Sequence, residues 1–442
     1  MNTLTLGEKL KEIRTAQGLS QDQVARAVKK YKSDISRFES GQAEPNQDVL
    51  EAIRKFLNIS NAPLLPPELE LYKDRLAIWE ELLDANRNDE ARTMQPEMAS
   101  ILTLPYEYDL IFQYMMQESR LLFKERNLSS MAASMEAAEA LLDNVSIKAL
   151  YLYHNNKGLL YDINGKYKSA LNHYLTAVDL LGSDRPDYRI LMNIARVYCQ
   201  LGKLHCAIRY AECGKREFRG DRTNKDGVNL NFLLADLYSH VYEFDKSEKM
   251  FNIVIQHARS IDDKFALGAA LACLGNINRL RKNYSEALGR LNQGLEIIEK
   301  LVITSDNWRR DAYSLTYALL TMIFAKVSCI MRMNKSDKNK KECQEVIALG
   351  RSYAQGNETL TIIINAISHL TTLDNPESTR YIEDVAIPYI INHLHSEASE
   401  KTLVLAFCRE LVEHYEKKKA KTKLAKIKAI MCDIYEDMFL GG

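Results

Sequence analysis

The sequence predicts an all-α protein in which a small domain of short helices precedes a long superhelical array of helix pairs. Glycine and proline are scarce, at 18 and 9 of 442 residues, so few positions interrupt a helix. Apolar residues recur with the helical period along most of the chain, and no convincing alternating strand is present. Beyond about residue 150, one order of small and bulky residues recurs four times, which is typical of a repeat architecture.

The composition is that of a soluble globular protein, with 46% apolar and 27% charged residues and a formal net charge of zero. Binding to nucleic acid would therefore require a local basic patch. The chain begins without an apolar leader and has no run of about 18 apolar residues, so we expect a cytoplasmic protein without membrane contact.

No residue pattern points to an enzyme or to a bound metal. The eight cysteines form no CxxC pair and no His/Cys set with zinc spacing, which favours reduced thiols in a reducing compartment. The sequence has no glycine-rich phosphate loop, no HExxH and no GxSxG. We expect no catalytic residues, no metal and no cofactor.

A proline-rich stretch, NAPLLPPE at residues 61–68, interrupts the helical pattern. It divides the chain into a first domain over residues 1–62, a linker over 63–70 and a repeat domain over 71–442. The last predicted helix has one apolar stripe opposite lysines, which fits a capping helix or a dimer contact. The stripe comprises Leu424, Ile427, Ile430, Met431, Ile434, Tyr435 and Met438.

The first sixty residues predict four short helices. An amphipathic helix covers residues 6–17, and Ser20 caps a second helix that runs to about Val28, with Gln23 completing a capping box. The residues that define the third and fourth helices are Ile35, Phe38, Gly41, Pro45, Val49, Leu50, Ile53, Phe56 and Leu57. Short helices joined by tight turns indicate a helix-turn-helix domain.

Within residues 4–60, the order of motifs resembles the XRE/Cro-type repressor domain. These motifs are G-x-x-L-x-x-x-R from Gly7, G-x-S-Q from Gly18, V-A at 24–25 and I-S-x-x-E-x-G from Ile35, followed by Pro45. The chain departs from the family at residues 29–31, where Lys-Lys-Tyr replaces the usual glycine, apolar residue and serine. We expect Arg14 and Glu39 to form a structural ion pair that joins the first helix to the third.

The resemblance implies that the third helix enters the major groove of DNA with its first residues leading. Lys32, Ser33, Asp34 and Arg37 would face base edges, because these side chains can pair with guanine or cytosine. The residues expected to contact DNA, including those that would hold phosphates, are Gln21, Lys29, Lys30, Lys32, Ser33, Asp34, Ser36 and Arg37. The alternative is that they form solvated helix faces. A domain this weakly basic is expected to bind as two copies on neighbouring half-sites.

The four repeated stretches place a small residue at two fixed positions. Small side chains let two antiparallel helices approach closely, and bulky residues one turn away fill the remaining space. The small positions are Gly158, Ala195, Ala235 and Gly275 in the first helix of each pair, and Ala170, Ala207, Ser247 and Ala287 in the second. This pattern resembles a degenerate tetratricopeptide (TPR) solenoid, with intervals of 37, 40 and 40 residues in place of about 34.

In TPR arrays the first helix of each pair lines the concave side. Asparagine amides both donate and accept hydrogen bonds, and arginine pairs with carboxylates, so a row of them can hold an extended peptide. The residues expected on or near this face, and therefore to bind a peptide, are Asn155, Asn156, Asn193, Arg196, Asn229, Asn276 and Arg279. The alternative is that asparagine is simply a tolerated polar residue in these repeats.

A helix-turn-helix domain joined to a long TPR array resembles the RRNPP family of peptide-sensing regulators. The resemblance implies a quorum-sensing transcription regulator that binds a double-stranded DNA operator and is controlled by a short signalling oligopeptide in the concave groove. It also implies a homodimer or tetramer whose arrangement changes with the peptide. Two alternatives stay open: a Rap-like protein that captures a response regulator or promotes its dephosphorylation, and an interaction scaffold with vestigial DNA binding.

Overall fold

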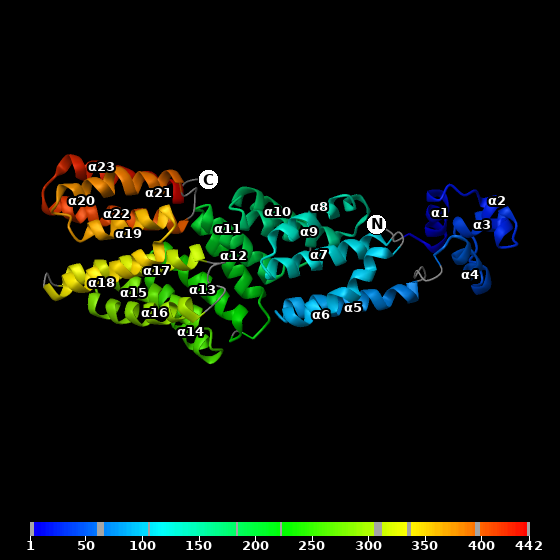
Figure 1. Ribbon diagram of the computed structural model, residues 1–442, viewed down its shortest axis with the longest axis horizontal. Coiled ribbons are helices and arrows are strands. Elements are labelled where there is room, and N and C mark those ends of the chain that lie inside the picture. Colours follow the sequence, from blue (N-terminus) through cyan, green and yellow to red (C-terminus); the bar gives the residue numbers. More distant parts are fainter. Residues whose placement is uncertain are drawn as a thin grey trace. The chain divides into compact units, whose positions relative to one another are not determined.

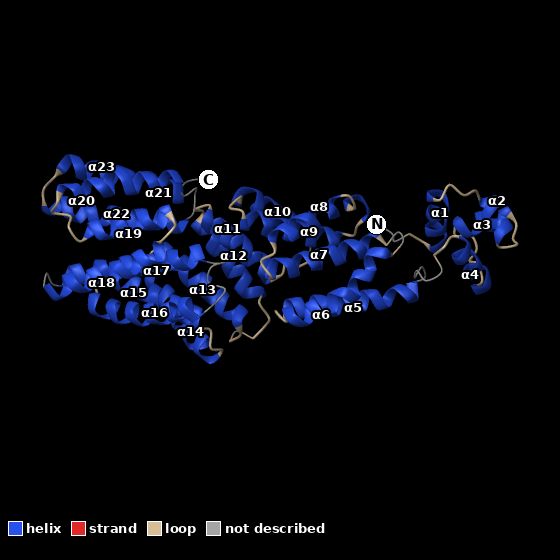
Figure 2. Cartoon of the chain, viewed as in Figure 1, coloured by secondary structure: helices blue, strands red, loops and turns tan. Residues whose placement is uncertain are grey.

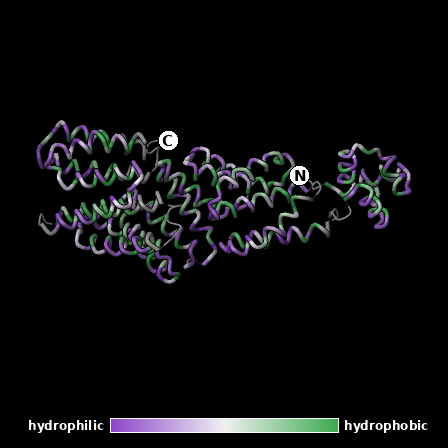
Figure 3. Tube along the Cα trace, in the orientation of Figure 1, coloured by the Kyte–Doolittle hydropathy of each residue, from purple (hydrophilic) through white to green (hydrophobic). Residues whose placement is uncertain are grey.

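The structure, a computed structural model, describes residues 4–59, 66–104, 107–182, 184–221, 223–304, 312–333, 337–393 and 398–439. Every regular element in these residues is a helix, as Figure 2 shows. Hydrophobic and hydrophilic residues alternate along the helices (Figure 3), as expected of helices that each bury one face. None of the described helices is long and apolar enough to cross a membrane. The predicted fold class is confirmed.

The chain folds into two compact units, residues 1–184 and 185–442 (Figure 1). The first unit begins with the predicted helix-turn-helix domain, here called the head, residues 4–59. Its helices are α1 (Leu6–Ala16), α2 (Gln21–Ala27), α3 (Lys32–Glu39) and α4 (Gln47–Phe56). Their inner faces form a separate core that includes Leu10, Val24, Ile35 and Ile53, each at most 3% exposed.

Capping chemistry sets the ends of the head helices. Ser20 and Gln23 form the predicted capping box at the start of α2, and Thr5 and Glu8 form another at the start of α1. Asn46 caps α4 by accepting from the backbone N–H of Val49. These caps satisfy backbone donors that would otherwise lack partners at each helix start.

The rest of the first unit is a series of helical pairs. Its elements are α5 (Pro66–Asp84), α6 (Asn88–Met98), the short helix η1 (Ala99–Thr103), α7 (Tyr108–Lys124), α8 (Leu128–Glu139), the short helix η2 (Leu142–Asn144), α9 (Ile147–Ile163) and α10 (Tyr167–Leu180). Because α5 begins at Pro66, residues 66–70 of the predicted linker are helical. Proline suits the first turn of a helix, where its missing N–H has no intrahelical partner. Residues 63–65 lie outside the described part.

The second unit continues the helix pairs and ends in two long helices. Its elements are α11 (Tyr188–Gln200), α12 (Leu204–Glu217), α13 (Lys225–His240), α14 (Phe244–Ser260), α15 (Lys264–Leu280), α16 (Tyr284–Thr304), α17 (Ala312–Met333), α18 (Asp337–Ala354), α19 (Glu358–Leu370), α20 (Pro376–Tyr381), the π-helical turn η3 (Ile382–Ala386), α21 (Ile387–His393), α22 (Ala398–Lys417) and α23 (Lys421–Phe439). Helices α22 and α23 fold back against α11 and α12. On the apolar stripe of α23, Ile427 and Ile434 are buried and the other described members are half-buried; the side chain of Met438 lies outside the described part.

The predicted small positions lie where paired helices cross, and all eight are buried. A methyl group added at Gly158 would lie 2.6 Å from the ring of Tyr174 on the paired helix. One added at Gly275 would lie 2.6 Å from Leu291. Such distances are shorter than a van der Waals contact, so an alanine at either position would force the neighbouring side chain to move. The steric explanation of the repeat is confirmed.

Candidate nucleic-acid interface and ligand pocket

An ion pair inside the head fixes α3 relative to α1. The Arg14 guanidinium donates from Nε to Glu39 Oε1 at 2.6 Å, from Nη2 to Glu39 Oε2 at 3.0 Å and from Nη1 to the Leu19 carbonyl at 2.6 Å. Hydrogen bonding to Glu39 raises the pKa of Arg14. Gln21 also donates to Glu39 Oε2, at 2.8 Å. The predicted structural role of Arg14 and Glu39 is confirmed.

The turn between α2 and α3 explains how this chain replaces the glycine usual at that point. Lys29 takes the left-handed backbone conformation, with φ of 55°. Glycine reaches this region without steric cost, whereas a lysine there is strained. The turn therefore has the geometry of a glycine-containing turn and adds a positive charge.

Six of the eight residues predicted to contact DNA are exposed, on α3 and the turn that precedes it. They are Lys29, Lys30, Lys32, Ser33, Ser36 and Arg37. Gln21 and Asp34 are half-buried, and both have internal partners: Gln21 bonds Glu39, and Asp34 accepts from the Tyr31 backbone N–H at 3.1 Å.

One residue of this face was not among those predicted. Tyr31, immediately before α3, exposes 81% of its surface. Its position in place of the small residue of the family pattern was the available signal. The reading face is defined hereafter as Lys29, Lys30, Tyr31, Lys32, Ser33, Ser36 and Arg37.

The predicted peptide-binding residues divide between the two units. On α9, Asn156 is fully buried and donates to the Met116 carbonyl at 2.8 Å, so its side chain packs between helices and is withdrawn from the expected set. The side-chain oxygen of Asn155 is buried and has no hydrogen-bond partner among the described residues. On α11, Arg196 donates to Asn193 at 3.0 Å. Asn229 is exposed on α13.

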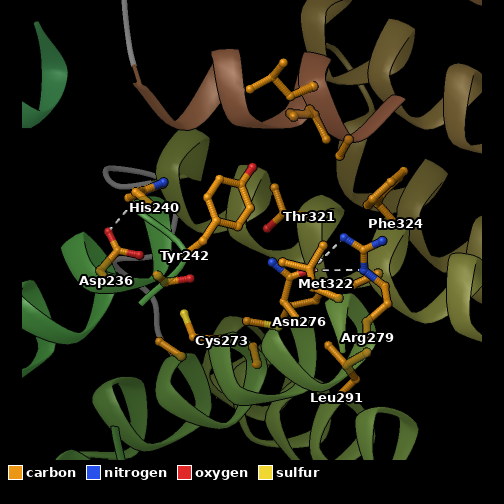
Figure 4. Close-up of a pocket in the computed structure, with 18 of the residues that line it drawn as sticks. Asp236, His240, Tyr242, Cys273, Asn276, Arg279, Leu291, Thr321, Met322 and Phe324 are labelled. Atoms are coloured by element: carbon orange, nitrogen blue, oxygen red, sulfur yellow. Dashed lines mark hydrogen bonds and ion pairs between the residues drawn. The ribbon is translucent and has the colours of Figure 1, made fainter. Parts of the chain in front are cut away.

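Asn276 and Arg279, both on α15, line a pocket inside the second unit. This cavity of about 360 Å³ is enclosed by α13, α15, α16, α17, α22 and α23 together with the α13–α14 turn. Figure 4 shows Asn276 and Arg279 joined on one side of the pocket and Asp236 and His240 joined on another. Much of the remaining wall is apolar, and includes Phe232, Phe265, Met322, Phe324, Leu403 and Leu405.

The Arg279 side chain belongs to a buried network of opposite charges. It donates to Asn276 Oδ1 from Nη2 at 2.9 Å, and its Nη1 lies 3.8 Å from Glu410 Oε1. Burial lowers the pKa of Arg279, and the nearby Glu410 carboxylate opposes that effect. Glu410 also accepts from Arg332 at 2.6 Å, and Glu413 pairs with the same arginine. The two arginines and two glutamates of this network neutralise one another.

An acid–histidine pair lies on another side of the pocket. His240 Nε2 is 3.4 Å from Asp236 Oδ2 on the preceding turn of α13. Burial opposes protonation of the imidazole, but attraction and hydrogen bonding to Asp236 prevail and raise the pKa of His240. Burial also raises the pKa of the neighbouring Cys273 thiol, which keeps it protonated and unreactive.

Comparison with known proteins agrees with this division into head and helical array. The helix-turn-helix family HTH_3 matches residues 10–60. The transcriptional activator NprA of Geobacillus stearothermophilus is 23% identical over 269 residues, which span 60% of this chain and 65% of NprA.

Two solved structures have a similar fold over most of the chain. The apo form of the quorum sensor NprR from B. thuringiensis superposes with a TM-score of 0.65 at 19% identity, over 83% of this chain and 99% of NprR. NprR in complex with its cognate peptide NprX gives 0.57 at 17% identity, over 83% and 98%. At the level of domain layout and fold, the predicted resemblance is confirmed.

Proposed function

We propose that this chain, which shares the domain layout and the fold of the RRNPP-type regulators, is a transcription regulator controlled by a short oligopeptide. The head would bind DNA, and the peptide would occupy the pocket of the second unit. The observation that carries the proposal is that one chain combines an exposed basic reading face with a polar-edged cavity lined by Asn276 and Arg279.

The head supports the DNA-binding half of the proposal by its rigidity and its charge. The Arg14–Glu39 pair holds α3 against α1, so the reading face is presented on a fixed scaffold. Lys29, Lys30, Lys32 and Arg37 supply four exposed cations on α3 and the turn before it. We expect Lys29 and Lys30 to contact phosphates and Arg37 to reach base edges. Two heads, from a homodimer in the cytoplasm, would read neighbouring half-sites.

The pocket supports the ligand-binding half by its size and its lining. Small-molecule and peptide sites are typically apolar cavities of about 300–1,000 Å³ with a few fixed polar groups. NprR, of similar fold, binds a peptide in its solved complex. A ligand can change DNA binding only by its differential affinity for two forms of the chain. About 2 kcal/mol of such coupling would change DNA affinity roughly thirty-fold.

The DNA half is tested with the DNA upstream of the protein's own gene, in anisotropy titrations of the full chain at several salt concentrations. Arg37→Ala should weaken binding to this DNA by about 1–3 kcal/mol and leave non-specific binding nearly unchanged. Lys29→Ala should weaken binding to all sequences and reduce the salt dependence by about one counterion. Lys55→Ala, an exposed lysine on α4 outside the reading face, is the matched control. Equal specific affinity of wild type and Arg37→Ala would refute DNA reading by α3.

A further inference from the structure

Among the described residues, no carboxylate forms an ion pair with Arg409, a cation at the wall of this pocket. We propose that Arg409 is the anion-binding point of the pocket and receives a carboxylate of the bound peptide, in the first instance its free C-terminus. This inference rests on the proposed function, because it specifies which chemical group of the ligand the pocket recognises.

Arg409, on α22, is held by two tyrosines from distant parts of the unit. Its Nη2 donates to Tyr435 on α23 at 2.8 Å and to Tyr242, which lies in the turn between α13 and α14. The two hydroxyl groups are 3.2 Å apart, and the guanidinium carbon lies 5.4 Å from the centre of the Tyr242 ring. All three residues line the pocket. The guanidinium is therefore fixed in position at the pocket wall.

The backbone at Tyr242 shows that this arrangement has a conformational cost. The corresponding positions of the two preceding helix pairs are Gly165 and Gly202, and all three have positive φ: 69°, 77° and 61° for Tyr242. Glycine reaches this region without steric cost, whereas a non-glycine residue held there is strained. Arg126 and Lys282 hold the same conformation in other turns between paired helices, so the strain belongs to the turn, which at residue 242 carries a tyrosine. Here the turn directs an aromatic ring and a hydroxyl group toward Arg409.

The charge balance of the pocket singles out Arg409. The pocket lining carries three fixed charges, on Asp236, Arg279 and Arg409. Asp236 is paired with His240, and Arg279 belongs to the neutral network with Glu410. Arg409 is half-buried, and no carboxylate of the described residues forms an ion pair with it. A partly desolvated cation without a counter-charge favours an anionic ligand.

The donor geometry favours a carboxylate as that anion. The hydrogen bonds of Arg409 use only Nη2, and among the described residues nothing accepts from Nη1 or Nε. These donors are free for a carboxylate, which guanidinium groups bind with short, charge-assisted hydrogen bonds. The apolar wall formed by Leu403, Leu405 and Met322 would accommodate neighbouring side chains of the peptide. The carboxylate can come from the peptide terminus or from an acidic side chain, and the test separates these sources.

The test uses two synthetic hexapeptide libraries of the same sequences, one with a free C-terminal carboxylate and one with a C-terminal carboxamide. The full-length protein is incubated with each library, and retained peptides are identified by mass spectrometry. Wild type should retain free-acid members about tenfold better than their amides, because a charge-assisted hydrogen bond contributes about 1.5–3 kcal/mol. Arg409→Gln should abolish that preference. Arg259→Gln, the same change at an exposed arginine of α14 outside the pocket, should preserve it.

Each remaining outcome has a defined meaning. Enrichment of aspartate and glutamate in the amide library, lost in Arg409→Gln, would assign the carboxylate to a side chain. Equal retention of both libraries by wild type, without acidic enrichment, would overturn the inference and leave the proposed function intact. Retention of no peptide from either library would overturn the proposed function itself. The comparison on wild type requires no variant, so a folding defect in Arg409→Gln cannot obscure the result; Arg409→Lys, which keeps the charge, should restore part of the preference.

Discussion

Two arginines, one in each compact unit, show how differently this chain uses a partly buried cation. In the head, Arg14 has its carboxylate partner within the domain, and three of its nitrogens donate hydrogen bonds. In the second unit, Arg409 is held by tyrosine hydroxyl groups and has no carboxylate partner among the described residues. A compensated charge serves the fold, because it locks α3 in place. A charge that is positioned but uncompensated is suited to a ligand.

Replacing each arginine in turn tests most directly whether Arg14 is structural and Arg409 is not. Arg14→Ala should destabilise the head by about 3–5 kcal/mol, because it leaves Glu39 buried without its counter-charge. Arg409→Gln should cost no more than about 1–2 kcal/mol, which corresponds to a half-exposed cation–π contact and two hydrogen bonds at the low end of their range. Hydrogen exchange measured by mass spectrometry on the full chain resolves the two units separately.

The double variant Arg14→Ala/Glu39→Ala provides the control. It should lose less stability than the sum of the two single variants, since it leaves no unpaired buried charge. If removal of Arg409 destabilised the second unit as much as removal of Arg14 destabilises the head, Arg409 would be a structural residue and the contrast would fail.

The two sites also differ in how much of them the sequence could predict. In the head, the residues of each motif lie within 25 positions of each other. Their spacing in the sequence therefore predicts the helices, the caps and the Arg14–Glu39 pair. In the pocket, Tyr242 contacts Arg409, 167 positions further along the chain, and Tyr435, 193 positions further along. No periodic pattern in the sequence relates these three residues. Tyr242 occupies a turn position that is glycine in the two preceding pairs but Lys282 in the next, so the sequence offered only a weak signal there.

The asparagines show a second limit of the sequence. Periodicity placed Asn155 and Asn156 together near the inner face of a first helix, yet adjacent residues on a helix point about 100° apart. One of them, Asn156, turns into the crossing with α7 and bonds a backbone carbonyl there. The helical period alone cannot decide whether Asn155 or Asn156 is buried, because that depends on how α7, some 40 residues earlier in the chain, packs against α9. In α15 the same reasoning led to Asn276 and Arg279, which do line the pocket.

A smaller effect tests whether close helix packing, rather than charge, holds the pocket-bearing unit together. Gly275→Ala, on α15, should destabilise that unit by about 1–3 kcal/mol, because the new methyl group would overlap Leu291 and approach the Ala287 carbonyl. Gly289→Ala on the paired helix α16 meets no atom within 4 Å. It should be neutral or stabilising by up to about 1 kcal/mol, since alanine favours helix. Thermal unfolding of both variants measures the difference. Equal effects would mean that the helices separate easily at this crossing.

The smallest predicted effect is a pH dependence of stability that differs between two histidines, one in each unit, because only one of them has a carboxylate partner. His240 has a carboxylate partner, and its pKa is raised from 6.5. His154 on α9 faces another histidine, His173, with their Nδ1 atoms 2.9 Å apart, and burial lowers the pKa of His154 from 6.5. Folding therefore favours protonation of His240 and disfavours protonation of His154.

The signs of the two pH dependences follow directly. Stability contributed by His240 is fully present below pH 6.5 and is lost as pH rises through its higher folded-state pKa. His154 instead destabilises the first unit as pH falls below 6.5, and this penalty disappears above that value. Hydrogen exchange corrected for intrinsic rates, from about pH 5 to about pH 8, should show these opposite trends between wild type and the His240→Gln and His154→Gln variants. Parallel trends in the two units would mean that Asp236 does not hold the proton on His240.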